Sequence, residues 1–272
     1  GEEQKVIDEV NDLVGGDDTG SYNTSPYVSC TPEGICGVGV VGLFLGADND
    51  ASDVSNNHTG IFKMSEDHGA SWHGCPEVQD QEGQGCAPSF DGNGYYFIPD
   101  DVWTDLVNTQ FNYEYVDDCD GTSELVNDFW SYYEDDFKVD RDGNPHFVIQ
   151  VLGCGDEFCY YLPESGIYHF TINREYLDNP GPVNTATGWS WSFVITGNDT
   201  WGWSDMTGNT YIWDNSSSLS FSTENTDIVY ITTNLATQGA FAGDEANLED
   251  PCYYTTWEDY PEWSEDIFVI KS

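Results

Sequence analysis

Clustered carboxylates in short loops are the residues of this chain best suited to chemistry. Side-chain oxygens at alternating positions can surround a hard cation such as Ca²⁺, which prefers oxygen ligands. Two loops have this pattern, but both lack the glutamate at the twelfth position of an EF-hand loop. The alternative to a calcium site is therefore an acidic loop that is simply solvated. The candidate calcium ligands are Asp48, Asp50, Ser52 and Asp53 in the first loop and Asp117, Asp118 and Asp120 in the second.

Aromatic residues in polar, loop-like surroundings are a second candidate for binding. Aromatic faces stack on sugar rings or anchor a protein partner, and packing between sheets is the alternative use for them. Asparagines in Asn-x-Ser/Thr sequences permit glycosylation of a secreted protein. The stacking candidates are Trp201, Trp203, Tyr253, Tyr254 and Trp257, and the glycosylation candidates are Asn23, Asn57, Asn198 and Asn215.

Motifs for nucleophilic or zinc-dependent hydrolysis are missing from the sequence. It holds neither a Ser/His/Asp order nor a His-Glu-x-x-His motif. A glycoside hydrolase needs only two carboxylates at a suitable separation, and 50 acidic residues supply candidates without singling out a pair. A third acidic loop, residues 140–144, contains Asp-Gly between strand-like runs, which predicts a plain β-turn rather than a calcium site.

The net charge of the chain limits its partners. Among 272 residues, 50 are acidic and 6 are basic, which gives a formal net charge of −44. No basic patch can form against phosphates, which excludes nucleic acid and disfavours anionic membrane surfaces. No apolar run reaches the ~18 residues that a membrane helix needs. Salt relieves self-repulsion of this size, so we predict an extracellular or cell-surface location in saline surroundings.

The eight cysteines predict disulfides in an oxidising compartment. Pairing of neighbours closes short loops and therefore costs the chain the least entropy. A zinc site is disfavoured, because the cysteine spacing is poor for zinc and no histidine–cysteine cluster accompanies it. The predicted pairs are Cys30–Cys36, Cys75–Cys86, Cys154–Cys159 and Cys119–Cys252.

The elements that must position these groups are mostly β-strands. Residues 1–20 are predicted to form an N-terminal helical or linker segment, and residues 100–111 a second helix, opened by proline and two acids. In the strand predicted at residues 189–196, one face is expected to carry Trp189, Trp191, Phe193 and Ile195. The other main predicted strands are 38–45, 60–64, 95–98, 136–139, 147–152, 167–173, 228–232 and 266–272.

The most specific motif is Ser-Glu-Asp-His-Gly-Ala-Ser-Trp at residues 65–72. It predicts a hairpin turn in which Asp67 folds its carboxylate back onto turn amides, Gly69 takes a positive φ and Trp72 begins the return strand. With Ser65 and Ser71, the pattern resembles the Asp-box, or BNR repeat, of sialidase-like β-propellers. In that family the motif is a fold staple on the outer rim of a blade.

This resemblance implies an all-β fold, a complete or partial β-propeller with insertions over residues 21–272, as in large exported proteins of marine bacteria. Sialidases of the family hold the substrate carboxylate with three arginines, whereas this chain has only Arg141 and Arg174, so we exclude sialidase activity. The expected function is a non-catalytic extracellular module that binds carbohydrate or protein, or builds a surface assembly through open strand edges. The alternatives are a polysaccharide-degrading glycoside hydrolase and a structural subunit of an extracellular fibre.

Overall fold

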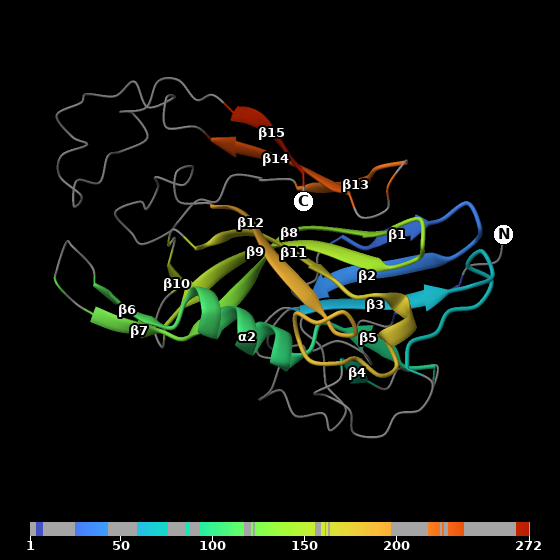
Figure 1. The fold of residues 1–272 in the computed structure, drawn as a ribbon, viewed down its shortest axis with the longest axis horizontal. Helices are drawn as coiled ribbons and strands as arrows, with labels where there is room; N and C mark the ends of the chain where they lie inside the picture. The colour runs from blue at the N-terminus through green and yellow to red at the C-terminus, as the bar shows by residue number, and fades with distance from the viewer. Residues whose placement is uncertain are drawn as a thin grey trace.

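The chain folds mainly into antiparallel β-sheets, as Figure 1 shows for this computed structural model. The predicted all-β class is therefore confirmed, and none of the sheets closes on itself in the part of the chain that is described. The structure describes residues 4–7, 25–42, 59–75, 85–87, 93–116, 121, 123–155, 159–160, 162, 164–196, 217–223, 225, 228–236 and 265–271.

The first sheet has the strand order β1-β2-β3-β5-β4. β2 and β3 are buried along their whole length, which explains why their sequences are continuous runs rather than alternating ones. They overlap the strands predicted at residues 38–45 and 60–64. The strands of this sheet are β1 (Tyr27–Cys30), β2 (Cys36–Gly42), β3 (Thr59–Ser65), β4 (Cys86–Ala87) and β5 (Tyr95–Phe97).

In the second sheet, β9 lies between β8 and β11, and β12 pairs with the far side of β11. The register between β11 and β12 shifts, so that Ile195 pairs with Ile167 while Phe193 pairs with Tyr168. Val194 is the extra residue of a β-bulge, and the prediction that Phe193 and Ile195 share a face is therefore wrong. The strands are β8 (Asp128–Val139), β9 (Pro145–Cys154), β10 (Cys159–Tyr160), β11 (Gly166–Thr171) and β12 (Ser190–Thr196).

The third sheet has the order β13-β14-β15, and the remaining elements are short. The predicted helix at residues 100–111 is confirmed as α2 (Asp100–Gln110), with Pro99 as its N-cap and two acids in its first turn. The other bounds are β13 (Ser218–Phe221), β14 (Val229–Ala236), β15 (Glu265–Lys271), the hairpin strands β6 (Tyr113–Val116) and β7 (Ser123–Val126), and the 3₁₀-helix η3 (Arg174–Tyr176).

The first and second sheets pack face to face over the main hydrophobic core, which α2 extends. Two glycines of β2 permit this close approach. A Cβ atom on Gly39 would lie 2.4 Å from Cγ of Phe137, and one on Gly37 would lie 2.7 Å from Cζ of the same ring. Phe62 of β3 lies within 5.3–6.0 Å, between ring centroids, of Tyr96, Phe137, Phe147 and Trp189.

The third sheet packs on the opposite face of the second sheet, so the three sheets are stacked in chain order (Figure 1). The first strands of the three sheets meet along β8. Tyr27 of β1 donates its hydroxyl to the Asp135 carbonyl oxygen at 2.7 Å. On the other side, the Leu219 N–H donates to the Asp136 carboxylate at 2.7 Å, and the Lys138 ammonium donates to the Leu219 carbonyl oxygen. These side chains of β8 satisfy backbone groups at the start of the third sheet.

Two predicted disulfides, Cys30–Cys36 and Cys75–Cys86, are present. Cys154 is also disulfide-bonded, and Cys159 lies opposite it in the pairing of β9 with β10. Disulfides are typical of oxidising, extracellular environments. The predicted pair Cys119–Cys252 lies outside the described residues.

The N-terminal segment that was predicted to be helical is described only at residues 4–7, which are not helical. There, Ile7 packs against a small buried cluster formed by Val40, Ile61, Tyr95 and Phe97. Among the described helices, none has the length and apolar character required to cross a bilayer.

Candidate functional site

Two hairpin turns of the same construction lie at one end of the first and second sheets. Residues 31–35 join β1 to β2, and residues 140–144 join β8 to β9. In each five-residue turn, the N–H of the first residue donates to the carbonyl oxygen of the fifth residue. The N–H of the fourth residue donates to the carbonyl oxygen of the first, and all four bonds measure 2.8 to 3.1 Å. The fourth residues, Gly34 and Gly143, both have a positive φ. The first two sheets therefore begin with the same local structure.

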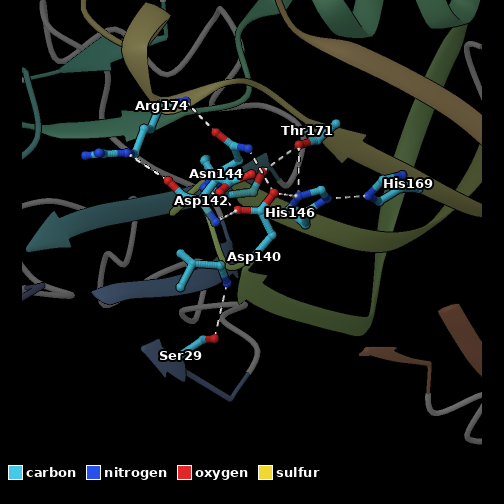
Figure 2. Close-up of polar contacts among 10 residues, drawn as sticks. Ser29, Asp140, Asp142, Asn144, His146, His169, Thr171 and Arg174 are labelled. Atoms are coloured by element: carbon cyan, nitrogen blue, oxygen red, sulfur yellow. Dashed lines mark hydrogen bonds and ion pairs between the residues drawn. The ribbon is translucent and has the colours of Figure 1, made fainter. Parts of the chain in front are cut away.

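Asp140 organises the second of these turns (Figure 2). Its Oδ1 accepts hydrogen bonds from the backbone N–H groups of Asp142 at 2.9 Å and Asn144 at 2.8 Å. Its Oδ2 accepts from the Asn144 side-chain amide at 2.8 Å and lies 3.4 Å from Nε2 of His146. Burial acts to raise the pKa of Asp140, but the bonds from His146 and Asn144 together hold it below its ordinary value. The turn is thus a β-turn held by a carboxylate, as predicted.

Behind Asp140 lies a buried pair of histidines. Nδ1 of His146 is 2.9 Å from Nε2 of His169, and the two rings are nearly parallel, with an interplanar angle of 9°. Burial, and then the neighbouring His146, lower the pKa of His169 to about 3. His146 thus lies between Asp140 on its Nε2 side and His169 on its Nδ1 side, so the three side chains form one continuous polar chain.

An open groove of about 550 Å³ lies where the two turns meet η3. Gly143 of the second turn packs closely against two residues of this groove, because a Cβ atom there would lie 2.7 Å from Cγ2 of Ile35 and 2.9 Å from Cδ of Arg174. The lining residues come from three separate segments of the chain. They are Glu33, Ile35, Arg141, Asp142, Asn144, Asn173, Arg174 and Glu175.

Both arginines of the chain line this groove, and they differ in the contacts that their guanidinium groups make. Arg174 is anchored: Nε donates to the Asp142 carbonyl oxygen at 2.9 Å, and Nη1 pairs with the Glu66 carboxylate at 2.9 Å. Its backbone N–H also donates to Oδ1 of Asn144 at 3.1 Å. Arg141 is exposed and makes no hydrogen bond or ion pair within the described part of the chain. One guanidinium is therefore structural, and the other is available to a ligand.

Glu66, which holds Arg174, belongs to the motif at residues 65–72. In that motif Oδ1 of Asp67 accepts from the Ser71 N–H and the Ser65 hydroxyl, both at 2.8 Å, and Oδ2 accepts from the Ser71 hydroxyl at 2.6 Å. The Gly69 N–H donates to the Ser65 hydroxyl at 2.9 Å, and Gly69 has a φ of 80°. The predicted carboxylate-held turn is therefore present.

The chain returns from this turn differently from the prediction. Trp72 does not begin a strand, since the return is an isolated bridge in which Met64 and His73 exchange two backbone hydrogen bonds of 2.8 Å. β5 occupies the neighbouring position beside β3 over Ile61 and Phe62. The turn also contacts the first hairpin turn, because the His68 N–H donates to the Gly34 carbonyl oxygen at 2.9 Å. The motif thus connects both sides of the groove.

Replacing Asp67 with alanine is expected to lower the melting temperature by a few degrees, because the amide and two hydroxyls that bind the carboxylate lose their acceptor. Hydrogen bonds from the Ser71 side chain and amide, and then from Ser65, lower the pKa of Asp67 to about 2. This value is below the unfolded 3.8, so the stabilisation is present above pH 3.8 and is lost as the pH falls through about 2. Thermal unfolding of D67A checks this, with E114Q as the exposed control; equal melting temperatures would contradict it.

The other predicted site residues lie outside the described residues. The described residues themselves contain no group of three or more His, Cys, Asp or Glu that could hold a metal ion. The predictions that stay open are the calcium ligands Asp48, Asp50, Ser52, Asp53, Asp117, Asp118 and Asp120, the stacking residues Trp201, Trp203, Tyr253, Tyr254 and Trp257, and the sequons at Asn23, Asn57, Asn198 and Asn215.

Sequence reasoning missed the groove itself. Its carboxylates, Glu33, Asp142 and Glu175, are individually ordinary among the acids of this chain. Arginine is rare in this sequence, and both arginines follow strands of the second sheet at the same end. Their shared position is the signal that could have located the groove. Comparison with known proteins gave no match to a family model, to a curated sequence or to a solved structure.

Proposed function

We propose that this chain is a non-catalytic, extracellular carbohydrate-binding module of the Asp-box β-propeller type, with the groove as its ligand site. Three features support a propeller. Antiparallel sheets follow one another along the chain, they stack face to face, and their first strands are adjacent. An Asp-box turn at the end of β3 agrees with the same architecture. Because none of the described sheets closes on itself, an open or incomplete ring of such sheets is the form of propeller that we propose.

An extracellular setting is supported by the disulfides and by the charge. Two disulfides are typical of an oxidising compartment. A net charge of −44 is most easily tolerated in saline surroundings, where the counterions screen it. Such an acidic chain suits binding in open solution better than burial in a tight assembly, where like charges would meet.

Carbohydrate is the ligand class that best suits the groove, and the groove's mixed lining is the observation that carries the proposal. Carboxylates of Glu33, Asp142 and Glu175 make no hydrogen bond within the described residues and accept from sugar hydroxyls, while the Arg141 guanidinium donates to them. The volume of about 550 Å³ falls within the usual range for small-ligand sites. A sugar hydroxyl both donates and accepts, so it uses both kinds of group.

A glycan array, run with and without calcium, tests this proposal. Saturable binding of a defined sugar, weakened in R141A and unchanged in E114Q, is the expected result. Absence of saturable binding to any glycan would overturn it. Calcium dependence would additionally support the acidic loops at residues 48–53 and 117–120 as cation sites.

A glycoside hydrolase is the second candidate, because the same groove is lined by three carboxylates that have no hydrogen-bond partner among the described residues. The same array distinguishes the two, since an enzyme would release reducing ends from the sugar that it binds. Turnover that is lost in E33Q, D142N or E175Q would establish catalysis and replace the binding proposal.

A further inference from the structure

The charge of the groove indicates the charge of its ligand. Three carboxylates and two guanidinium groups line it, which leaves one net negative charge. The Arg174 guanidinium is already paired with Glu66, so counting that pair leaves the groove with two more negative than positive groups. The field of the whole chain, with a net charge of −44, has the same sign.

An anionic ligand is therefore poorly matched to the groove. Arg141 is the one groove guanidinium without a partner in the described part of the chain. A carboxylate or sulfate bound there would face Glu33, Asp142 and Glu175 at close range, and like charges repel most strongly where water is partly excluded. Two arginines at one site thus do not make this an anion site.

A metal ion is also a poor match. The groove carboxylates come from three different segments, the β1–β2 turn, the β8–β9 turn and η3. No group of three or more such side chains among the described residues is close enough to hold a metal. A cation for this groove must be large enough to reach carboxylates that do not converge on one point, and it must bring its own hydrogen-bond donors.

We propose that the groove binds an amino sugar through its protonated amino group. This inference rests on the proposed carbohydrate-binding function and specifies the ligand class. The ammonium group donates charge-assisted hydrogen bonds to a groove carboxylate, and the ring hydroxyls can donate to carboxylates farther along the groove. The ring hydroxyls accept from Arg141 and meet the polar lining around Asn173. Neutralising the net negative groove supplies selectivity over neutral and acidic sugars.

The two arginines provide a direct measurement. Because they are the chain's only arginines, their Nε–H groups give two ¹⁵N-correlated NMR signals, and both report on the groove. A glucosamine disaccharide is titrated at mildly acidic pH, where its amines are protonated, beside its N-acetylated counterpart and a uronic-acid disaccharide. We expect saturable shifts of the Arg141 signal and binding about tenfold tighter for glucosamine than for the N-acetylated form, equal to about 1.4 kcal/mol.

Variants separate the groove from general attraction by an acidic protein. D142N and E33Q should reduce the preference for the amine, R141Q should increase it, and E114Q on the exposed face of β6 should leave it unchanged. A preference that falls equally in E114Q would overturn the inference, because it would reflect net charge alone.

The remaining outcomes distinguish this inference from the function on which it rests. Equal affinity for the amine and N-acetylated forms, or tighter binding of the uronic acid, would overturn the amino-sugar inference and keep a carbohydrate site. Absence of binding by all three disaccharides, together with a glycan array without saturable binding, would overturn the proposed function itself.

Discussion

Replacing Asp140 with alanine is expected to lower the free energy of unfolding by about 3–5 kcal/mol and to abolish the sugar binding that we propose for the groove. The Asp140 carboxylate is buried and is the acceptor for two backbone N–H groups and the Asn144 amide. Its removal leaves these donors and His146 without their partner inside the fold. Because Asp142 and Asn144 line the groove, the loss of the turn also displaces the backbone oxygen that anchors Arg174.

Urea unfolding of D140A and the wild type, followed by the tryptophan signal, measures this effect. T31V is the matched control, since Thr31 has the corresponding position in the first turn and makes a single, longer bond of 3.3 Å to the Ile35 N–H. T31V should lose much less stability. A D140A protein that unfolds within about 1 kcal/mol of the wild type would show that the turn does not depend on this carboxylate.

The local features of this chain could be predicted because residues close together in the sequence determine them. The turn at residues 65–72 follows from serine, aspartate and glycine at fixed spacing, and α2 follows from proline and two acids before an apolar stripe. The disulfides Cys30–Cys36 and Cys75–Cys86 follow from short loop closure. Each prediction used interactions within about a dozen residues.

Features that depend on contacts between distant segments were missed or misjudged. Three consecutive acids, Glu134, Asp135 and Asp136, lie within β8, and the pairing of this strand with β9 overrides their weak local β-propensity. The bulge at Val194 arises from pairing with β11 and has no local signature. The groove joins turns more than a hundred residues apart, as the pair Glu66–Arg174 illustrates, so no linear motif encodes it. Likewise, His146 and His169 meet only through the register of β9 with β11.

The same histidine pair makes the fold sensitive to acid. His169 has a pKa of about 3 in the folded chain against 6.5 when unfolded. Between these values the unfolded chain binds one more proton, so stability rises with pH and falls by about 1.4 kcal/mol for each pH unit below 6.5. From pH 6.5 to 4.5 we therefore expect a loss of about 2 kcal/mol from this site, because the unfolded histidine is only half protonated at pH 6.5.

Asp140 is a charged group in contact with the pair, through Nε2 of His146. The pKa of Asp140, which faces His146, is held below its ordinary value, so its stabilisation persists above pH 3.8 and fails only below the histidine window. Lys138 and Asp136 of β8 pair with each other and are bound to Leu219 at the start of the third sheet. The loss between pH 6.5 and 4.5 is thus expected to follow the imidazole of His169.

H169Q isolates this contribution, because glutamine stays neutral and its amide can still donate to Nδ1 of His146. We measure the free energy of unfolding in urea across this pH range. Its slope against pH should be smaller in H169Q than in the wild type, by the amount that corresponds to about one proton taken up on unfolding. H68Q is the control, since His68 is exposed in the turn at residues 65–72. Parallel profiles for the wild type and H169Q would show that His169 accepts a proton within the fold, and would contradict its lowered pKa.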